Sequence, residues 1–412
     1  MEVVHERCCG LDVHKKVVVA CLIVPGKDGR RHKTVRSFGT MTADLLALAD
    51  WLSEEGCTHV AMESTGVYWK PIYNLLEGQF ELLVVNAQHL KAVPGRKTDV
   101  SDAEWIADLL QHGLLRGSFV PSAAQRQLRE LTRYRKSLIT ERTRSINRLH
   151  KVLQDANIKL SSVVSDIMGV SSRSMLEALS REQSDPSQLA SLARGRLREK
   201  RSELEKALDG IVKSHHRFMI VAHLEHIDFL EQAIARVSAE IEERLRPFEA
   251  ELALLDTIPG VSQRTAEVLL AEIGADMTRF ATHRHLASWA GMCPGNNESA
   301  GKRKSGKTRK GSPWLRCALV EAAHAASHSR DTYLAAQYHH LARRRGAKRA
   351  LIAVGHTILV IAYYLLLRKE AYREIGGNYY DERDRHAVQY RLVRRLNNLG
   401  YQVTLTPAAA LA

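Results

Sequence analysis

Four acidic residues near the amino end have types and spacing that could build a metal site. Asp12 interrupts an apolar stretch in GLDVHKK, and Glu63 ends the apolar segment HVAME. Asp99 and Asp102 lie three positions apart in KTDVSDAEW. Close carboxylates repel one another unless a cation compensates them, and Mg²⁺ is the hard ion that prefers oxygen ligands. Two such ions about 4 Å apart promote phosphoryl transfer, so the four acids predict an enzyme of that chemistry.

Each acid alone also has an ordinary structural interpretation. Asp99 or Ser101 is a typical N-cap, the helix dipole favours Asp102 in a first turn, and Glu63 can be a strand-end charge. What favours a common site is their order along the chain. The first strand and the strand after the first crossover lie side by side in a mixed sheet, so Asp12 and Glu63 can meet. A helix over that edge adds Asp99 and Asp102 from one face.

A basic segment, GMCPGNNESAGKRKSGKTRKGSPW at residues 291–314, is too rich in glycine and charge for a core element. A serine hydroxyl needs activation before it attacks, and cations beside it would neutralise and hold a phosphate. The segment is therefore either a phosphate-binding loop that presents Ser299, with Ser305 as a competing serine, or a solvated basic loop. Its cations are Lys302, Arg303, Lys304, Lys307, Arg309 and Lys310.

The elements that must position these residues alternate in the first 122 residues. Apolar runs and capping signals predict a mixed sheet with helices packed on it. The expected strands are residues 7–13, 16–24, 32–41, 59–63 and 80–86, and the expected helices begin near residues 42, 68 and 101.

From about residue 122 to 246 the strand signal disappears, and apolar residues recur at helical spacing within 128–153 and 224–241. The pattern predicts two long antiparallel helices resembling a coiled coil. The density of arginine on the first helix favours a phosphate track, with a solvated charged face as the alternative. The track comprises Arg126, Arg129, Arg133, Arg135, Lys136, Arg142, Arg144, Arg148 and Lys151.

The remainder, from about residue 252, is predicted to be mainly helical, with a short strand at YQVTLT, residues 401–406. Pro259, Gly260 and Val261 resemble the turn of a helix-hairpin-helix element. That turn either presents a helix N-terminus to a phosphate or simply joins two helices.

The net charge of +14 favours a polyanionic partner, and nucleic acid is the usual one. LIAVGHTILVIAYYLLL, residues 351–367, is shorter than the roughly 20 residues of a membrane span, which predicts a buried helix and no membrane. The amino end has no apolar signal segment, and the six cysteines form no CxxC pair. We therefore expect reduced thiols and a cytoplasmic protein.

Several motifs together resemble one family. GLDVHK, MESTGVYW and KTDVSDAEWIADLL are similar to the N-terminal domain of the DEDD insertion-sequence transposases, the IS one-ten group, which includes the pilin-gene invertase Piv. LLDTIPGVSQRTAEVLLAEIG, FATHRHLASWAGMCPG, NNESAGKRKSGKTRKGSPWLRCALVEAA and LGYQVTLTP resemble its C-terminal transposase domain. The middle of the chain matches only in its helical character.

The resemblance implies an α/β plus α architecture in three domains. They would be a RuvC-like, RNase H-type nuclease domain at 1–122, a helical coiled-coil domain at 123–251 and a mainly helical transposase domain at 252–412. By motif match, Asp12, Glu63, Asp99 and Asp102 would bind Mg²⁺.

The same resemblance implies that Ser299 forms a transient phosphoserine bond with DNA. The family often has two serines followed by two glycines, whereas this chain reads Glu298, Ser299, Ala300 and Gly301. The implied partners are target and donor DNA, a noncoding bridge RNA that pairs with both, and further copies of the chain in a tetramer built as a dimer of dimers. A bacterial, nucleoid-associated location follows from these partners.

Two other functions stay open. A RuvC-type structure-specific endonuclease would let water attack the phosphate and would not need Ser299. A nucleic-acid scaffold would need none of the acids. The chain has no GxxxxGK[ST] motif, so no nucleotide-driven step is expected.

Overall fold

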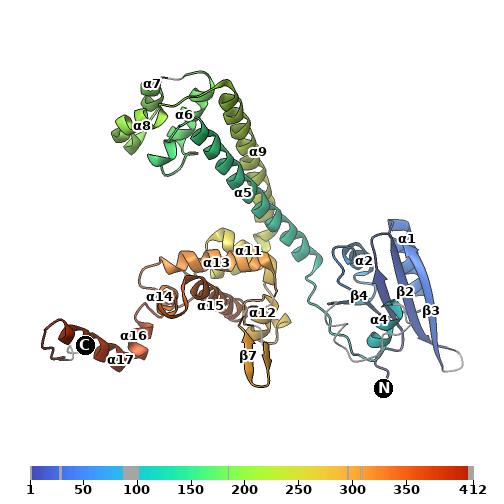
Figure 1. The fold of residues 1–412 in the computed structure, drawn as a ribbon. Coiled ribbons are helices and arrows are strands. Elements are labelled where there is room, and N and C mark those ends of the chain that lie inside the picture. Colours follow the sequence, from blue (N-terminus) through green and yellow to red (C-terminus); the bar gives the residue numbers. More distant parts are fainter. Residues whose placement is uncertain are drawn as a thin grey trace. The chain divides into compact units, whose positions relative to one another are not determined.

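The computed structural model describes residues 2–26, 30–86, 102–183, 185–294, 297–306, 308 and 310–406 (Figure 1). The chain divides into two compact units, Met1–Ala123 and Ala124–Ala412. Each unit has its own hydrophobic cores. The predicted second boundary, after residue 251, stays a prediction.

The first unit contains a five-stranded mixed sheet in the order β3-β2-β1-β4-β5. β1, β2 and β3 pair antiparallel, whereas β1, β4 and β5 run parallel, which requires the crossovers that contain α1 and α2. The mixed sheet predicted from the sequence is therefore confirmed. The bounds are β1 Cys8–Val13, β2 Val17–Pro25, β3 Arg31–Gly39, α1 Thr42–Glu54, β4 His59–Glu63, α2 Trp69–Leu76, β5 Glu81–Val85 and α4 Asp102–Gln111.

The two faces of the sheet bury different side chains of β1. Cys9, Leu11 and Val13 pack in the core that includes α1 and α2. Cys8 belongs instead to the core that includes α4. Because side chains alternate along a strand, Asp12 lies on the α4 face together with Cys8 and Gly10.

In the second unit, α5 (Ala123–Asp155) and α9 (Ser214–Leu245) pair along their length (Figure 1). As residue numbers increase along α5, the numbers of their partners on α9 decrease, so the two helices are antiparallel as predicted. The pairs are Gln127–Arg244, Arg142–Glu231 and Asp155–His216. At the end marked by Asp155 these helices share a core with η1 (Leu160–Ser162), α6 (Val170–Ser180), α7 (Pro186–Ser191), η2 (Gly195–Lys200) and α8 (Arg201–Leu208).

The rest of the second unit is mainly helical, with one two-stranded hairpin, β6–β7. α15 meets the length and hydropathy of a membrane span, yet half of that apolar window is buried in the protein. It packs against α10, α12, α13 and α14, as expected for the core helix predicted from the sequence. The bounds are η3 Arg246–Phe248, α10 Glu249–Asp256, α11 Gln263–Ile273, η4 Met277–Arg279, α12 His283–Trp289, β6 Asn297–Ser299, β7 Lys302–Ser305, α13 Pro313–Ser327, α14 Tyr333–Arg345, α15 Ala347–Arg368, α16 Tyr379–Arg383 and α17 Arg385–Asn398.

Two local predictions for this unit need correction. Residues 401–406, expected as a strand, have no regular secondary structure and are almost entirely exposed. A lone strand leaves its backbone groups without partners, so β-forming residue types alone do not make one. The basic segment, expected as a loop, forms the β6–β7 hairpin over part of its length.

Candidate functional site

Asp12 and Glu63 occupy neighbouring positions on one face of the sheet. The parallel register of β1 and β4 pairs Leu11 with Met62, and the next residue of each strand is Asp12 and Glu63 respectively. Adjacent strands are about 4.8 Å apart, so this register places the two acids side by side at the strand ends. Ala61, two residues before Glu63, packs in the α4 core, which puts Glu63 on the same face as Asp12.

The helix α4 begins over this pair of acids. Its backbone crosses β1 closely, since a Cβ on Gly10 would lie 2.3 Å from the Ala103 oxygen. The Gln111 oxygen, at the other end of α4, accepts hydrogen bonds from the Val4 and His5 amides before β1. α4 therefore runs antiparallel to β1, and its first turn lies toward the strand end that carries the acids.

This orientation brings Asp102, the first residue of α4, to the edge occupied by Asp12 and Glu63. We call these three residues the acidic edge. Asp99, the fourth predicted acid, lies outside the described residues. Two strand ends and a helix start therefore lie at one edge of the sheet, while a common metal site formed by their carboxylates stays a prediction.

Hydrogen bonds from neighbouring residues orient two of the three side chains of the acidic edge. His14 Nε2 lies 3.1 Å from Asp12 Oδ2, and the Thr65 hydroxyl donates to Glu63 Oε1 at 3.2 Å. The side chain of Asp12 is 24% exposed, so solvent and a cation can reach it. A set of carboxylate oxygens suits a hard divalent cation such as Mg²⁺.

A tighter group of ligand atoms lies elsewhere in the described part of the chain. Asp155, His215 and His216 have ligand atoms within 4.8 Å of one another. His216 Nδ1 accepts from the Lys213 amide at 3.1 Å, and its Nε2 lies 2.7 Å from Asp155 Oδ2. The hydrogen bond from His216 lowers the pKa of the Asp155 carboxyl. Both imidazole nitrogens of His216 are thus already used: Nε2 joins α9 to α5, and Nδ1 caps the start of α9.

The hairpin that carries Ser299 is built around a two-residue turn. β6 and β7 pair antiparallel, with Ser299 opposite Lys302. Ala300 and Gly301 have φ of 50° and 72°, the left-handed values that two-residue hairpin turns require. Glycine adopts this conformation readily and alanine does so at a cost. The unusual Ala300 therefore occupies a position where backbone geometry favours glycine.

The base of the hairpin is held where the chain enters and leaves it. Arg316 of α13 donates from Nη2 to the Gly291 oxygen at 2.6 Å. At Gly311 an added Cβ would lie 2.3 Å from the Ala290 oxygen, so the departing chain packs directly on the entering chain. Only glycine permits this approach.

A fully buried carboxylate connects the hairpin to α5. Glu272 receives two hydrogen bonds from Arg133, at 2.7 and 2.9 Å, and one from the Ser312 hydroxyl at 3.1 Å. Ser312 also caps α13 by accepting from the Leu315 amide. Arg129 donates to the backbone oxygens of residues 271 and 272, and burial lowers its pKa to about 10.

We call Arg129, Arg133, Glu272 and Ser312 the buried anchor. Glu272 and Ser312 were not predicted from the sequence, although Ser312 followed by Pro313 is a recognisable helix start. Arg129 and Arg133 were predicted to contact phosphate, and Glu272 competes with any phosphate for both. Their phosphate contacts stay predictions beside the structural role seen here.

Other predicted phosphate contacts have different surroundings. Arg144 and Arg148 are exposed on α5, and Lys302 and Lys310 are exposed at the hairpin. Lys307 and Arg309 lie outside the described residues, as do the side chains of Ser299, Ser305, Arg303 and Lys304. The turn at Gly260 packs closely on α13, because an added Cβ would lie 2.4 Å from the Ala322 oxygen.

Comparisons with known proteins agree at both ends of the chain. A family model described as "Transposase" matches residues 9–158, and one described as "Transposase IS116/IS110/IS902 family" matches residues 252–340. Together these matches span more than half of the chain. They include the acidic edge and the hairpin.

Three curated relatives carry similar descriptions. The chain is 25% identical over 379 residues to "Transposase for insertion sequence element IS1111A" of Coxiella burnetii, which covers 89% of this chain and 88% of the relative. It is 29% identical over 226 residues to "Insertion element IS110 uncharacterized 43.6 kDa protein" of Streptomyces coelicolor, which covers 50% of this chain and 55% of the relative. It is 31% identical over 128 residues to "Putative transposase y4pF/y4sB" of Sinorhizobium fredii, which covers 30% of this chain and 33% of the relative.

Proposed function

Because the chain belongs to the IS110 family of insertion-sequence transposases, enzymes that cleave DNA and exchange its strands, we propose a Mg²⁺-dependent recombinase in which Ser299 is the nucleophile. We assign the first unit to the RuvC-like, RNase H-type nucleases. The observation that supports the proposal is the acidic edge, where Asp12 and Glu63 lie on neighbouring strand ends and Asp102 begins α4.

The acids of this edge would hold the cation. Asp12 and Glu63 contribute from the sheet, Asp102 from α4, and Asp99 completes the set by motif match. Bound Mg²⁺ would polarise the scissile phosphate and lower the pKa of an attacking hydroxyl. His14 and Thr65 would hold the carboxylates in place through the hydrogen bonds described above.

Ser299 would transfer the phosphate in two balanced steps. Its Oγ attacks phosphorus, the bond to the leaving DNA oxygen breaks, and the serine proton ends on that oxygen. One strand then has a free hydroxyl and the other a phosphoserine ester. A hydroxyl of the exchanged strand reverses the step and releases Ser299. Because each step exchanges one ester for another, no nucleotide hydrolysis is required.

Cations on the hairpin would assist this transfer. Lys302 faces Ser299 in the β6–β7 register, and Lys310 is exposed where the chain leaves the hairpin. Positive charge there would reduce the repulsion between an incoming nucleophile and the phosphodiester. Lys307 and Arg309 would extend the same charge by motif match.

The finer assignments follow the family resemblance and the net charge of +14. We propose target and donor DNA as substrates, a noncoding bridge RNA as guide, a tetrameric assembly and action in the bacterial cytoplasm at the nucleoid. The described part of the chain, with exposed Arg144 and Arg148 on α5, supports an extended polyanion contact.

Recombination between two plasmids tests the proposal. The reaction is run with and without the noncoding RNA that flanks the element, using the wild type, Asp102→Ala and Ser299→Ala. The wild type should recombine only with RNA and Mg²⁺ and should leave a protein–DNA adduct on a denaturing gel. Both variants should lose product, and Ser299→Ala should also lose the adduct. Cleavage by Ser299→Ala with no attached protein would support attack by water instead.

A further inference from the structure

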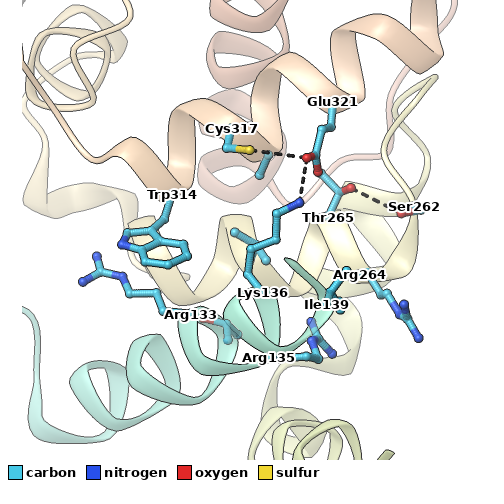
Figure 2. A pocket seen from close by; sticks show the side chains of 13 residues that line it. Arg133, Arg135, Lys136, Ile139, Ser262, Arg264, Thr265, Trp314, Cys317 and Glu321 are labelled. Atoms are coloured by element: carbon cyan, nitrogen blue, oxygen red, sulfur yellow. Dashed lines mark hydrogen bonds and ion pairs between the residues drawn. The ribbon is translucent and has the colours of Figure 1, made fainter. Parts of the chain in front are cut away.

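A cavity of about 280 Å³ lies among α5, α11 and α13, next to the buried anchor (Figure 2). Lys136 and Ile139 line it from α5, Arg264 from α11, and Trp314 and Glu321 from α13. Arg133 of the anchor also borders it. The volume is close to the lower end of the range for pockets that hold small ligands.

The charges around the cavity leave positive charge available to a ligand. Arg135 is buried against Glu267 at 2.6 Å, and Arg133 is bound to Glu272, so both are neutralised inside the protein. Arg264 is exposed in the first turn of α11, and among the described residues no ion pair is found for it. It therefore provides a cation at the rim.

Lys136 is a second cation that a ligand can recruit. It pairs with Glu321 at 2.6 Å, with 34% and 56% of the two side chains exposed. Exposed ion pairs of this kind contribute little to stability, so Lys136 can change partners at small cost. Figure 2 shows Lys136 reaching across the cavity toward Glu321.

The walls of the cavity are apolar, in contrast to its charged rim. The indole of Trp314 is half-buried, and Ile139, Val268 and Ala318 add apolar surface beside it. A flat aromatic ring, apolar neighbours and cations at the rim form the combination that binds an unstacked nucleotide. The base stacks on the ring while the phosphate meets the cations.

We propose that this cavity holds one unstacked nucleotide of the bound nucleic acid, with its base against Trp314 and its phosphate near Arg264 and Lys136. We call it the nucleotide cavity. Ser262 precedes α11, and its hydroxyl pairs with the Thr265 hydroxyl at 3.2 Å and caps no backbone amide, which leaves amide groups of the first turn for the same phosphate.

This assignment rests on the nucleic-acid chemistry of the proposed function, but not on Ser299 as nucleophile. Trp314 follows Ser312, which Glu272 holds at the base of the hairpin. A nucleotide in the cavity would therefore be fixed relative to the segment that carries Ser299. DNA and RNA share the nucleotide chemistry, and the experiment distinguishes them.

Photocrosslinking of the full chain tests the cavity. The probes are an oligothymidylate carrying one 5-iododeoxyuridine and an oligouridylate carrying one 5-iodouridine. Irradiation followed by peptide mapping should place the crosslink on Trp314, with the DNA or the RNA probe according to the strand that occupies the cavity. Crosslinks found only at other residues with both probes would overturn the proposal.

Affinity for the same probes provides a second measurement. Trp314→Ala should weaken binding roughly 5- to 150-fold through loss of stacking, and Trp314→Phe should restore most of it. Arg264→Glu, at an exposed position, should weaken binding without unfolding. Arg181→Glu is the matched control for Arg264→Glu, since Arg181 is an exposed arginine that follows α6 and does not line the cavity.

The outcomes separate the cavity from the nucleophile. Ser299→Ala should retain the Trp314 crosslink even though recombination is lost. If Trp314→Ala and Arg264→Glu both fold, by circular dichroism, and bind as tightly as the wild type, the nucleotide cavity is refuted. If they weaken binding while Ser299→Ala still recombines, the proposed nucleophile fails and the cavity stands.

Discussion

The acidic edge and the hairpin place chemically reactive groups by different means. The acidic edge belongs to a hydrogen-bonded sheet, and the closeness of α4 to Gly10 sets its third member. The hairpin has two strands and is attached to the second unit through Arg316, Gly311 and the buried anchor. Strand pairing and helix packing position the first group, whereas contacts of a few single residues position the second. Substitutions should therefore affect the two regions differently.

The largest effect is expected at the buried anchor. Glu272→Ala leaves two arginines without their carboxylate in the interior, which should destabilise the second unit by about 3–5 kcal/mol. Chemical denaturation measures the loss. Glu231→Ala, which breaks an exposed pair with Arg142, is the control and should cost less than about 1 kcal/mol. Equal effects of the two substitutions would contradict the role of burial.

The second largest effect is expected where α4 contacts the sheet. Gly10→Ala introduces a methyl group into the α4 backbone and should cost roughly 2–3 kcal/mol. Hydrogen exchange in α4 peptides should rise and Mg²⁺ binding should fall, because Asp102 loses its position. Gly117→Ala is the control, since its Cβ meets only Leu83 at 3.7 Å. Unchanged exchange in Gly10→Ala would show that α4 does not need this close approach.

Metal dependence should distinguish the acidic edge from the hairpin. Saturating Mg²⁺ should stabilise the first unit by roughly 1–3 kcal/mol, because only the folded edge gathers the carboxylates. Asp12→Asn should remove that gain, and without Mg²⁺ it should be neutral or slightly stabilising through reduced repulsion. Thermal melts with and without the ion measure both. A Mg²⁺ response retained in Asp12→Asn would exclude Asp12 as a ligand.

The smallest effect is expected at the hairpin turn. Ala300→Gly relieves a left-handed alanine at φ 50° and should stabilise the hairpin by about 0.5–1 kcal/mol. The reciprocal change Gly301→Ala, at φ 72°, should loosen it by a similar amount. Hydrogen exchange at the Lys302 amide measures each change. Identical protection in both variants would mean that the turn conformation does not limit the hairpin.

The features that could be predicted from the sequence are those that depend on interactions between residues close together in the chain. Helix and strand patterns near Asp12, Glu63 and Asp102 were readable because periodicity and capping are local signals. The pairing of α5 with α9 was readable from apolar stripes. YQVTLT failed because a strand also needs a partner, and the hairpin was missed because glycine and charge obscured its short strands.

The sequence by itself determined the order of elements, the placement of acids at two strand ends and a helix start, and the family. Only tertiary structure decided that α4 runs antiparallel to β1 and delivers Asp102 to the acidic edge. It also decided that Arg133 meets Glu272, 139 residues away, and that Trp314 and Lys136 border one cavity. The physical reason is that local patterns follow from backbone geometry. Contacts between distant segments depend instead on which faces pack, and on the close approaches that glycine permits.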